Sequence, residues 1–141
     1  MTVFADSSAV VKLYADEEYA ELVRGVEFLV VSAVARVEVP AALWRKSRMG
    51  ELPVADAAVL TEAFAHDWTC TDRFVRVAVG TALFAEAAGL VARHGLRAYD
   101  GVQLACAVAA RRADPGISTV ACFDRELGEA VAREGFRLLA C

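Results

Sequence analysis

The sequence lacks several features that mark particular classes of protein. Across its 141 residues, no apolar run approaches the roughly 20 residues that a membrane-spanning helix needs. No basic segment precedes the first apolar run, so we expect no secretory signal and a cytoplasmic protein. The net charge of −4 argues against a generic polyanion-binding protein, although it permits a local basic track beside an acidic site.

Cysteine and histidine are also scarce. The chain has four cysteines: Cys70, Cys106, Cys122 and Cys141. They form no CxxC pair and show no zinc-ligand spacing with a histidine, so we expect free thiols rather than zinc sites or disulfides. His66 and His94 have no partners at spacings that metal or nucleophile chemistry requires, and we expect structural or surface roles for both.

Apolar residues are abundant, at 57% of the chain, and their pattern predicts a single domain over residues 1–141. Five short apolar runs predict strands at residues 2–5, 28–31, 74–79, 119–123 and 136–139. Seven segments predict helices at residues 7–14, 16–25, 32–47, 54–66, 81–94, 96–112 and 125–133. This alternation predicts an α/β fold, a three-layer α/β/α sandwich around a mostly parallel five-stranded sheet.

Acidic residues follow the predicted strands. Asp6 ends the first strand and Asp124 ends the fourth, so both should lie at the same edge of a parallel sheet. Glu38 follows the second strand by about two helical turns, and Asp100 opens a helix that begins at that edge. We therefore expect the four carboxylates to share one pocket.

Each acid also has an ordinary structural interpretation. Asp6 and Asp100 are suited to helix N-termini, Asp124 to the N-cap of the last helix, and Glu38 to a solvated surface. Four neighbouring carboxylates, by contrast, cannot all stay ionised without compensation. Oxygen ligands of this kind suit Mg²⁺ or Mn²⁺, and a metal so held activates water against a phosphodiester. The suggested chemistry is phosphodiester hydrolysis.

Four segments, in this order and at these spacings, resemble a known family. They are Asp6-Ser7-Ser8-Ala9 with Lys12-Leu13-Tyr14, Arg36-Val37-Glu38-Val39, Leu96-Arg97-Ala98-Tyr99-Asp100 with Leu104-Ala105, and Phe123-Asp124-Arg125-Glu126-Leu127. The chain resembles the PIN-domain ribonucleases, specifically the VapC-type toxins of bacterial type II toxin–antitoxin systems. The resemblance extends over essentially the whole chain.

The resemblance implies a function and a set of residues for it. It implies a Mg²⁺- or Mn²⁺-dependent endoribonuclease that forms a homodimer and binds a cognate antitoxin protein. The matching metal-binding acids are Asp6, Glu38, Asp100 and Asp124, with Ser8 as a supporting polar residue. One position departs from the family, which often has Thr or Ser where this chain has Cys122. A thiol is a weaker hydrogen-bonding group, which leaves the support of Asp124 open.

Other interpretations stay open at this point. A catalytically silent PIN-like module that binds RNA or protein would share the fold. A phosphoacceptor receiver domain would need an acidic pair after the first strand and a late lysine, whereas the only lysines here are Lys12 and Lys46. Arg45, Lys46 and Arg48 suit either an RNA track or a solvated surface. Tyr99 suits base stacking, although we expect a core position for it.

Overall fold

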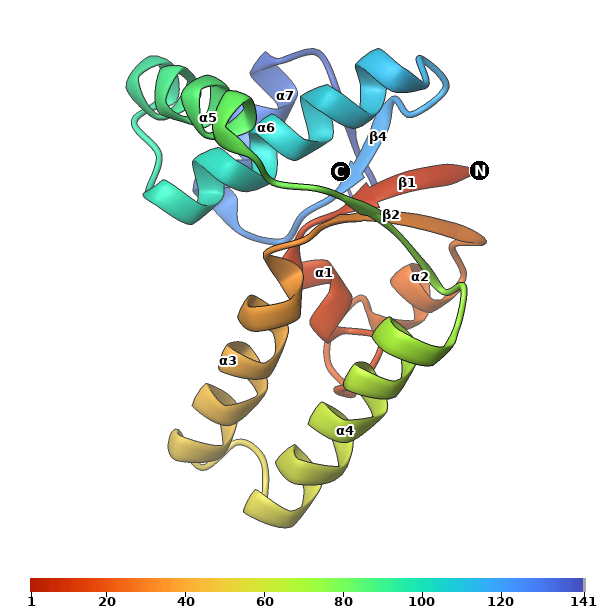
Figure 1. Ribbon diagram of the computed structural model, residues 1–141. Helices are drawn as coiled ribbons and strands as arrows, with labels where there is room; N and C mark the ends of the chain where they lie inside the picture. The colour runs from red at the N-terminus through yellow and green to blue at the C-terminus, as the bar shows by residue number, and fades with distance from the viewer. Residues whose placement is uncertain (141) are drawn as a thin grey trace.

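A computed structural model describes residues 1–140 and shows one parallel sheet between two layers of helices (Figure 1). The strand order is β3-β2-β1-β4-β5, and every neighbouring pair is parallel. The strands are β1 (Thr2–Ala5), β2 (Phe28–Ser32), β3 (Phe74–Val77), β4 (Thr119–Ala121) and β5 (Arg137–Leu138). This arrangement confirms the predicted fold class and the predicted order of elements.

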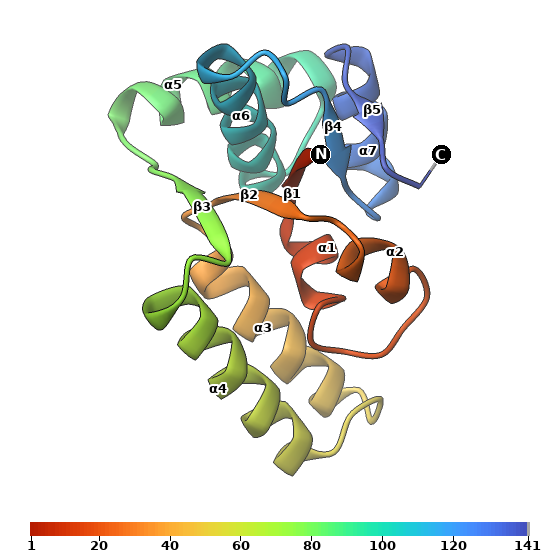
Figure 2. The same cartoon turned by 90° about the vertical axis from the view of Figure 1, so that its right-hand side faces the viewer.

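Every connection between consecutive strands contains at least one helix. The helices are α1 (Ser7–Val11), α2 (Ala20–Arg24), α3 (Ala35–Arg48), α4 (Val54–Cys70), α5 (Thr81–His94), α6 (Ala98–Ala113) and α7 (Arg125–Arg133). Figures 1 and 2 show α5, α6 and α7 on one side of the sheet and α1 to α4 on the other. None of the helices within residues 1–140 is long and apolar enough to cross a membrane.

Successive side chains of the central strand, β1, point to opposite faces of the sheet. The apolar core therefore has two parts, one beneath each layer of helices. Val3 and Ala5 of β1 belong to a cluster with the α1 to α4 side, where Leu43 and Phe64 are fully buried. Phe4 points into the opposite cluster, with Leu104 of α6. Because both faces of β1 are covered, its three buried positions, Val3 to Ala5, are all apolar, as in other buried parallel strands.

Three helix starts differ from the predictions, and one of them is that of α6, which begins at Ala98 rather than at residue 96. Ser32 does not cap a helix: it is the last residue of β2, and its hydroxyl accepts a hydrogen bond from the Val34 N–H at 3.2 Å. That local turn delays the start of α3 to Ala35, so Glu38 lies in the first turn of this helix. The helix predicted from residue 16 begins only at Ala20, because Tyr19 adopts a left-handed conformation at φ 67°.

Several strand ends are also shorter than predicted. β3 stops at Val77 and β4 at Ala121, so Cys122 and Phe123 belong to the connection that leads to Asp124. As predicted for the helix over residues 32–47, α3 runs through Pro40. The carboxyl ends of β1 and β4 are hydrogen-bonded neighbours, and the Asp6 N–H donates to the Ala121 carbonyl at 3.1 Å.

Candidate active site

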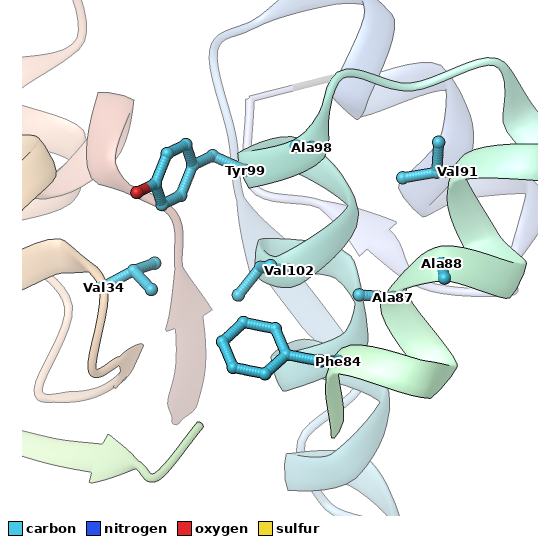
Figure 3. A pocket seen from close by; sticks show the side chains of 8 residues that line it. All are labelled: Val34, Phe84, Ala87, Ala88, Val91, Ala98, Tyr99 and Val102. Carbon is cyan, nitrogen blue, oxygen red and sulfur yellow. The ribbon is translucent and has the colours of Figure 1, made fainter. Parts of the chain in front are cut away.

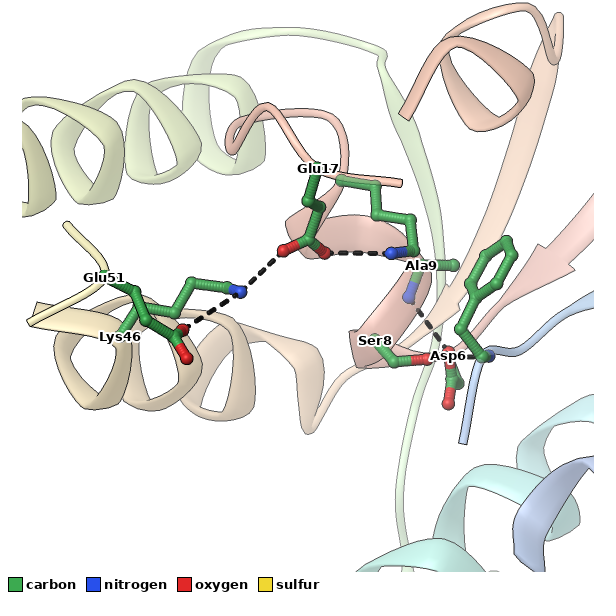
Figure 4. A network of polar contacts seen from close by, with 8 residues as sticks. Asp6, Ser8, Ala9, Glu17, Lys46 and Glu51 are labelled. Atoms are coloured by element: carbon green, nitrogen blue, oxygen red, sulfur yellow. Dashed lines mark hydrogen bonds and ion pairs between the residues drawn. The ribbon is translucent and has the colours of Figure 1, made fainter. Parts of the chain in front are cut away.

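Asp6 leaves β1 and immediately caps α1. Its Oδ1 accepts the Ser8 hydroxyl at 2.6 Å and the Ala9 N–H at 3.1 Å (Figure 4). The residue is only 4% exposed. Asp6 is therefore a helix cap and, at the same time, a buried carboxylate at the carboxyl edge of the sheet. The predicted role of Asp6 as a helix cap is confirmed, and its role in metal binding stays a prediction.

Burial raises the pKa of the Asp6 carboxyl to about 6. The hydrogen bonds from Ser8 and Ala9 lower this pKa, and the nearby charge of Glu38 raises it. Asp6 takes part in none of the ion pairs found within residues 1–140, so no basic side chain offsets its charge there. Such an uncompensated, buried acid is typical of a functional site.

Glu38 is held by two side chains that are not among the predicted site residues, Ser7 and Gln103. Its Oε1 accepts the Ser7 hydroxyl at 2.9 Å and the Gln103 amide at 2.7 Å. Gln103 also donates to Ser7 at 3.0 Å, which closes a triangle of side chains from three helices. A signal for Gln103 was present: it follows Asp100 by three residues, hence on the same helical face, in an otherwise apolar stretch.

The amide oxygen of Gln103 has an unusual environment. Gln103 is 2% exposed, and its Oε1 is buried with no hydrogen-bond partner within residues 1–140. Buried polar atoms without partners are rare in folded proteins, because each costs the desolvation of the group. An unpaired oxygen beside Glu38 adds one more acceptor to a region already rich in carboxylates.

Asp100 and Asp124 lie on the other side of this region. Burial raises the pKa of the Asp100 carboxyl, and the charges of Asp124 and Glu38 raise it further, so all three lie close enough to repel. Asp124 is the N-cap of α7, and its Oδ1 accepts the Leu127 N–H at 3.0 Å. The structure thus links Asp6 to Glu38, and Asp100 to both Glu38 and Asp124.

Cys122 and Ser8 connect the two acids that follow β1 and β4. The Cys122 thiol donates to the Asp124 backbone carbonyl at 3.5 Å, and burial together with the nearby charge of Asp6 raises the pKa of this thiol. The Ser8 hydroxyl, which donates to Asp6, accepts the Phe123 N–H at 3.0 Å. Ser8 therefore joins the first acid to the segment that carries the last one.

The donors at this edge suit a hard cation, although no ready-made ligand set is present. All are oxygen atoms, they carry uncompensated charge, and one buried amide oxygen lacks a partner. This chemistry fits Mg²⁺ or Mn²⁺. Within residues 1–140, no three His, Cys, Asp or Glu side chains stand close enough together to hold a metal directly. Mg²⁺ commonly binds through one or two carboxylates and keeps several waters, which such spacing allows.

An apolar groove lies along α5 and the start of α6, and none of the four acids is among the residues that line it. It has a volume of about 630 Å³ and is lined by side chains that include Val34, Phe84, Tyr99 and Val102 (Figure 3). Tyr99 is 59% exposed, so the prediction that it lies in the core is wrong. The reason is its position beside Asp100 in the first turn of α6, where it faces outward over Val34 rather than into the sheet.

Comparisons with known structures agree with this architecture. Mycobacterium tuberculosis VapC20, described as a toxin that cleaves the sarcin-ricin loop, is 18% identical, with a TM-score of 0.62 over 95% of each chain. PAE2754 from Pyrobaculum aerophilum is 21% identical, with a TM-score of 0.65 over 99% of this chain and 84% of the other. At such identities the likeness shows a shared fold.

Sequence comparisons add the family. A search of curated proteins found no significant match. A model of the PIN domain family, however, matches residues 3–131, which include Asp6, Glu38, Asp100 and Asp124. Since that match extends over most of the chain, the protein belongs to the PIN domain family.

Proposed function

We propose that this protein is a metal-dependent endoribonuclease whose four edge acids, Asp6, Glu38, Asp100 and Asp124, hold Mg²⁺ or Mn²⁺. One observation carries the proposal. In a PIN domain, at the carboxyl edge of the parallel sheet, Asp6 and Asp100 have raised pKa values, and none of the four acids takes part in an ion pair found within residues 1–140. A divalent cation would supply the missing positive charge.

The chain's own residues would then hold the acids in place. Ser8 and the Ala9 N–H orient Asp6 through Oδ1. Ser7 and Gln103 both bind Oε1 of Glu38, which leaves its Oε2 available to a ligand. When bound, the metal lowers the pKa of a water and neutralises charge on the phosphodiester. Oriented acids reduce the reorganisation needed for these steps.

RNA is the substrate class that similarity supports best. PIN domains are generally nucleases, and the VapC20 toxin, similar in fold, is described as cleaving an RNA loop. A catalytically silent binding module is the alternative. In such a module, buried acids without basic partners would have no functional role. An activity measurement separates the two.

The test compares wild type with Asp6→Asn on RNA. We expect cleavage in Mg²⁺ or Mn²⁺ that stops with chelator and falls at least about a hundredfold in the variant, since Asn keeps the shape but loses the charge. Cleavage that survives both the chelator and Asp6→Asn would refute the metal mechanism. Absence of cleavage by the wild type on all RNAs, with metal, would favour the binding module.

We also propose a homodimer and a cognate antitoxin protein as partners. The support is the family and a set of exposed apolar side chains, among them Val37, Phe84 and Tyr99. We expect a dimer in light scattering at micromolar concentration; a monomer throughout that range would contradict it. A bound antitoxin should abolish cleavage, and undiminished cleavage in the complex would contradict inhibition at the site.

A further inference from the structure

Lys12 is a buried cation one helical turn beyond Ser8. Its side chain is 9% exposed, and its ammonium binds Oε1 of Glu17 at 3.0 Å. The other oxygen of Glu17 binds Lys46 of α3 at 2.5 Å, and Lys46 also lies 3.8 Å from Glu51 (Figure 4). The hydrogen bonds from Lys46 and Lys12 lower the pKa of Glu17, although burial alone would raise it. The only two lysines of the chain therefore share one carboxylate.

The same ammonium lies against an aromatic ring. The Lys12 Nζ is 4.7 Å from the ring centroid of Phe123, within the range of a cation–π contact. Tyr19 stacks on this ring, with centroids 5.3 Å apart and planes at 21°. Within residues 1–140, Tyr19 is also the only non-glycine residue with a positive φ, a conformation that needs support from its surroundings. Phe123 is thus contacted by both Lys12 and Tyr19.

The backbone of Phe123 leads directly to the acids. Its N–H donates to the Ser8 hydroxyl at 3.0 Å, and that hydroxyl donates to Asp6 at 2.6 Å. The next residue is Asp124. Any shift of Phe123 therefore moves Asp124 and loosens the hydroxyl that orients Asp6. The contacts run in an unbroken series from Glu17 through Lys12 and Phe123 to both acids.

We propose that Lys12 is a positioning residue. Together, Lys12 and Tyr19 hold the Phe123 ring in place, an arrangement that we call the clamp. The clamp keeps Asp6 and Asp124 in the relative position that metal binding requires. The proposal rests on the proposed metal-dependent activity but concerns a residue that does not touch the metal or RNA. An alternative role, direct contact with a phosphate, is disfavoured because the ammonium is covered and already paired with Glu17. A positioning residue acts through the acids, so its loss changes metal affinity first.

The first experiment follows the metal-free protein and needs no activity. Lys12→Met keeps the apolar stem and removes the charge, and Lys46→Met is the matched control, because it removes the other lysine from Glu17 without touching Phe123. We expect the Phe123 amide to exchange hydrogen at least about tenfold faster in Lys12→Met than in wild type, and at an unchanged rate in Lys46→Met. Equal exchange in all three proteins would overturn the proposal.

The second experiment measures Mn²⁺ affinity by calorimetry. We expect about a tenfold loss in Lys12→Met, substantial recovery in Lys12→Arg, and less than a twofold change in Lys46→Met. On RNA, kcat should fall while KM stays near wild type; a raised KM with unchanged kcat would assign Lys12 to phosphate binding instead. Wild-type Mn²⁺ affinity in Lys12→Met would likewise overturn the proposal.

Two further outcomes distinguish a failure of the clamp from a failure of the proposed metal-dependent activity. If the wild type neither binds Mn²⁺ nor cleaves RNA, the proposed function fails, while the exchange of the Phe123 amide still decides the clamp. If Lys12→Met does not fold, Tyr19→Ala removes the other face of the clamp and leaves the ion pairs intact. It should also speed exchange at Phe123, and an unchanged rate would overturn the clamp.

Discussion

Two groups of acids in this protein differ in how their charge is balanced. Glu17 and Glu134 each bind two basic side chains, Lys12 and Lys46 in one case and Arg93 and His94 in the other. Their pKa values are lowered by these partners, although burial alone would raise them. Asp6 and Asp100, at the carboxyl edge of the sheet, have no such partners and have raised pKa values.

The two groups of acids therefore differ in their effect on stability: the paired acids stabilise the fold, and the unpaired acids destabilise it. A paired carboxylate stabilises the native state in its charged form, whereas an unpaired buried one costs free energy when it ionises. The unpaired acids share one edge of the sheet, and the paired ones link loops and helices elsewhere. Substitutions that neutralise one member of each group should therefore have opposite consequences, and the three predictions below follow from that contrast.

The largest expected effect is the loss of activity in Asp100→Asn. We expect cleavage to fall at least about a hundredfold, because the change removes a proposed ligand, while the metal-free protein stays as stable as wild type or gains stability from relieved repulsion with Asp124 and Glu38. Mn²⁺ should raise the melting temperature of the wild type much more than that of the variant. Thermal melts with and without Mn²⁺, beside an RNA cleavage assay, measure both effects.

Glu134→Gln is the control for this prediction, because it neutralises a paired acid away from the edge. Its cleavage rate and its Mn²⁺-dependent gain in melting temperature should match those of the wild type. Strong destabilisation of metal-free Asp100→Asn would instead make Asp100 a structural residue of the α6 N-terminus, and the contrast between the two groups would not hold.

An intermediate effect should come from the titration of Asp6. Its folded pKa of about 6 is higher than the value near 4 of an unfolded chain. The folded state therefore binds the proton more tightly, so this residue makes stability fall as pH rises from about 4 to about 6, by about 3 kcal/mol in total.

Urea unfolding of metal-free protein across this pH range, for wild type and Asp6→Asn, isolates the contribution. We expect the difference in unfolding free energy between the two proteins to shift in favour of the variant as pH rises, and to level off above about pH 7. A difference independent of pH would mean that Asp6 has the same pKa in the folded and unfolded states, and a shift in favour of the wild type would mean that its folded pKa is lowered, as in a compensated acid.

The sequence alone predicts those features of the site that depend only on strand order. Asp6 and Asp124 each follow an apolar run, and parallel alternation alone places the ends of such runs at one edge. The lengths of α5 and α7 followed from equally local signals, namely apolar periodicity and Gly95. In each case the information lies within a few residues of the feature.

Features that depend on tertiary contacts were missed. The spacing of Gln103 from Asp100 places both on one helical face, but Gln103 meets Glu38 and Ser7 only because three helices converge, and local sequence does not predict these partners. Glu17 was assigned to a helix start, whereas it lies in a loop and binds Lys12, five residues earlier, and Lys46 of α3. Tyr99 was expected in the core because aromatic residues usually are, but its turn of α6 faces a groove.

The smallest expected effect is that of Glu134→Gln on stability. Glu134 accepts hydrogen bonds from Arg93 at 3.0 Å and contacts His94 at 2.8 Å, and its side chain is 16% exposed. Glutamine still accepts a hydrogen bond at this place, so only the charged part of the interaction is lost. Since Arg93 is largely exposed to solvent, we expect a loss of about 1 kcal/mol or less at pH 7.

The pH dependence of this loss has the opposite sign to that of Asp6. The folded pKa of Glu134 is lowered, so its contribution to stability is present above the unfolded value near 4 and disappears as pH falls below it. Urea unfolding of wild type and Glu134→Gln at pH 7 and at pH 3 measures this directly, with salt expected to reduce the difference at pH 7. A variant more stable than wild type at pH 7 would show that Glu134, like Asp6, is an acid under strain, and pairing with basic side chains would then not be what divides the two groups.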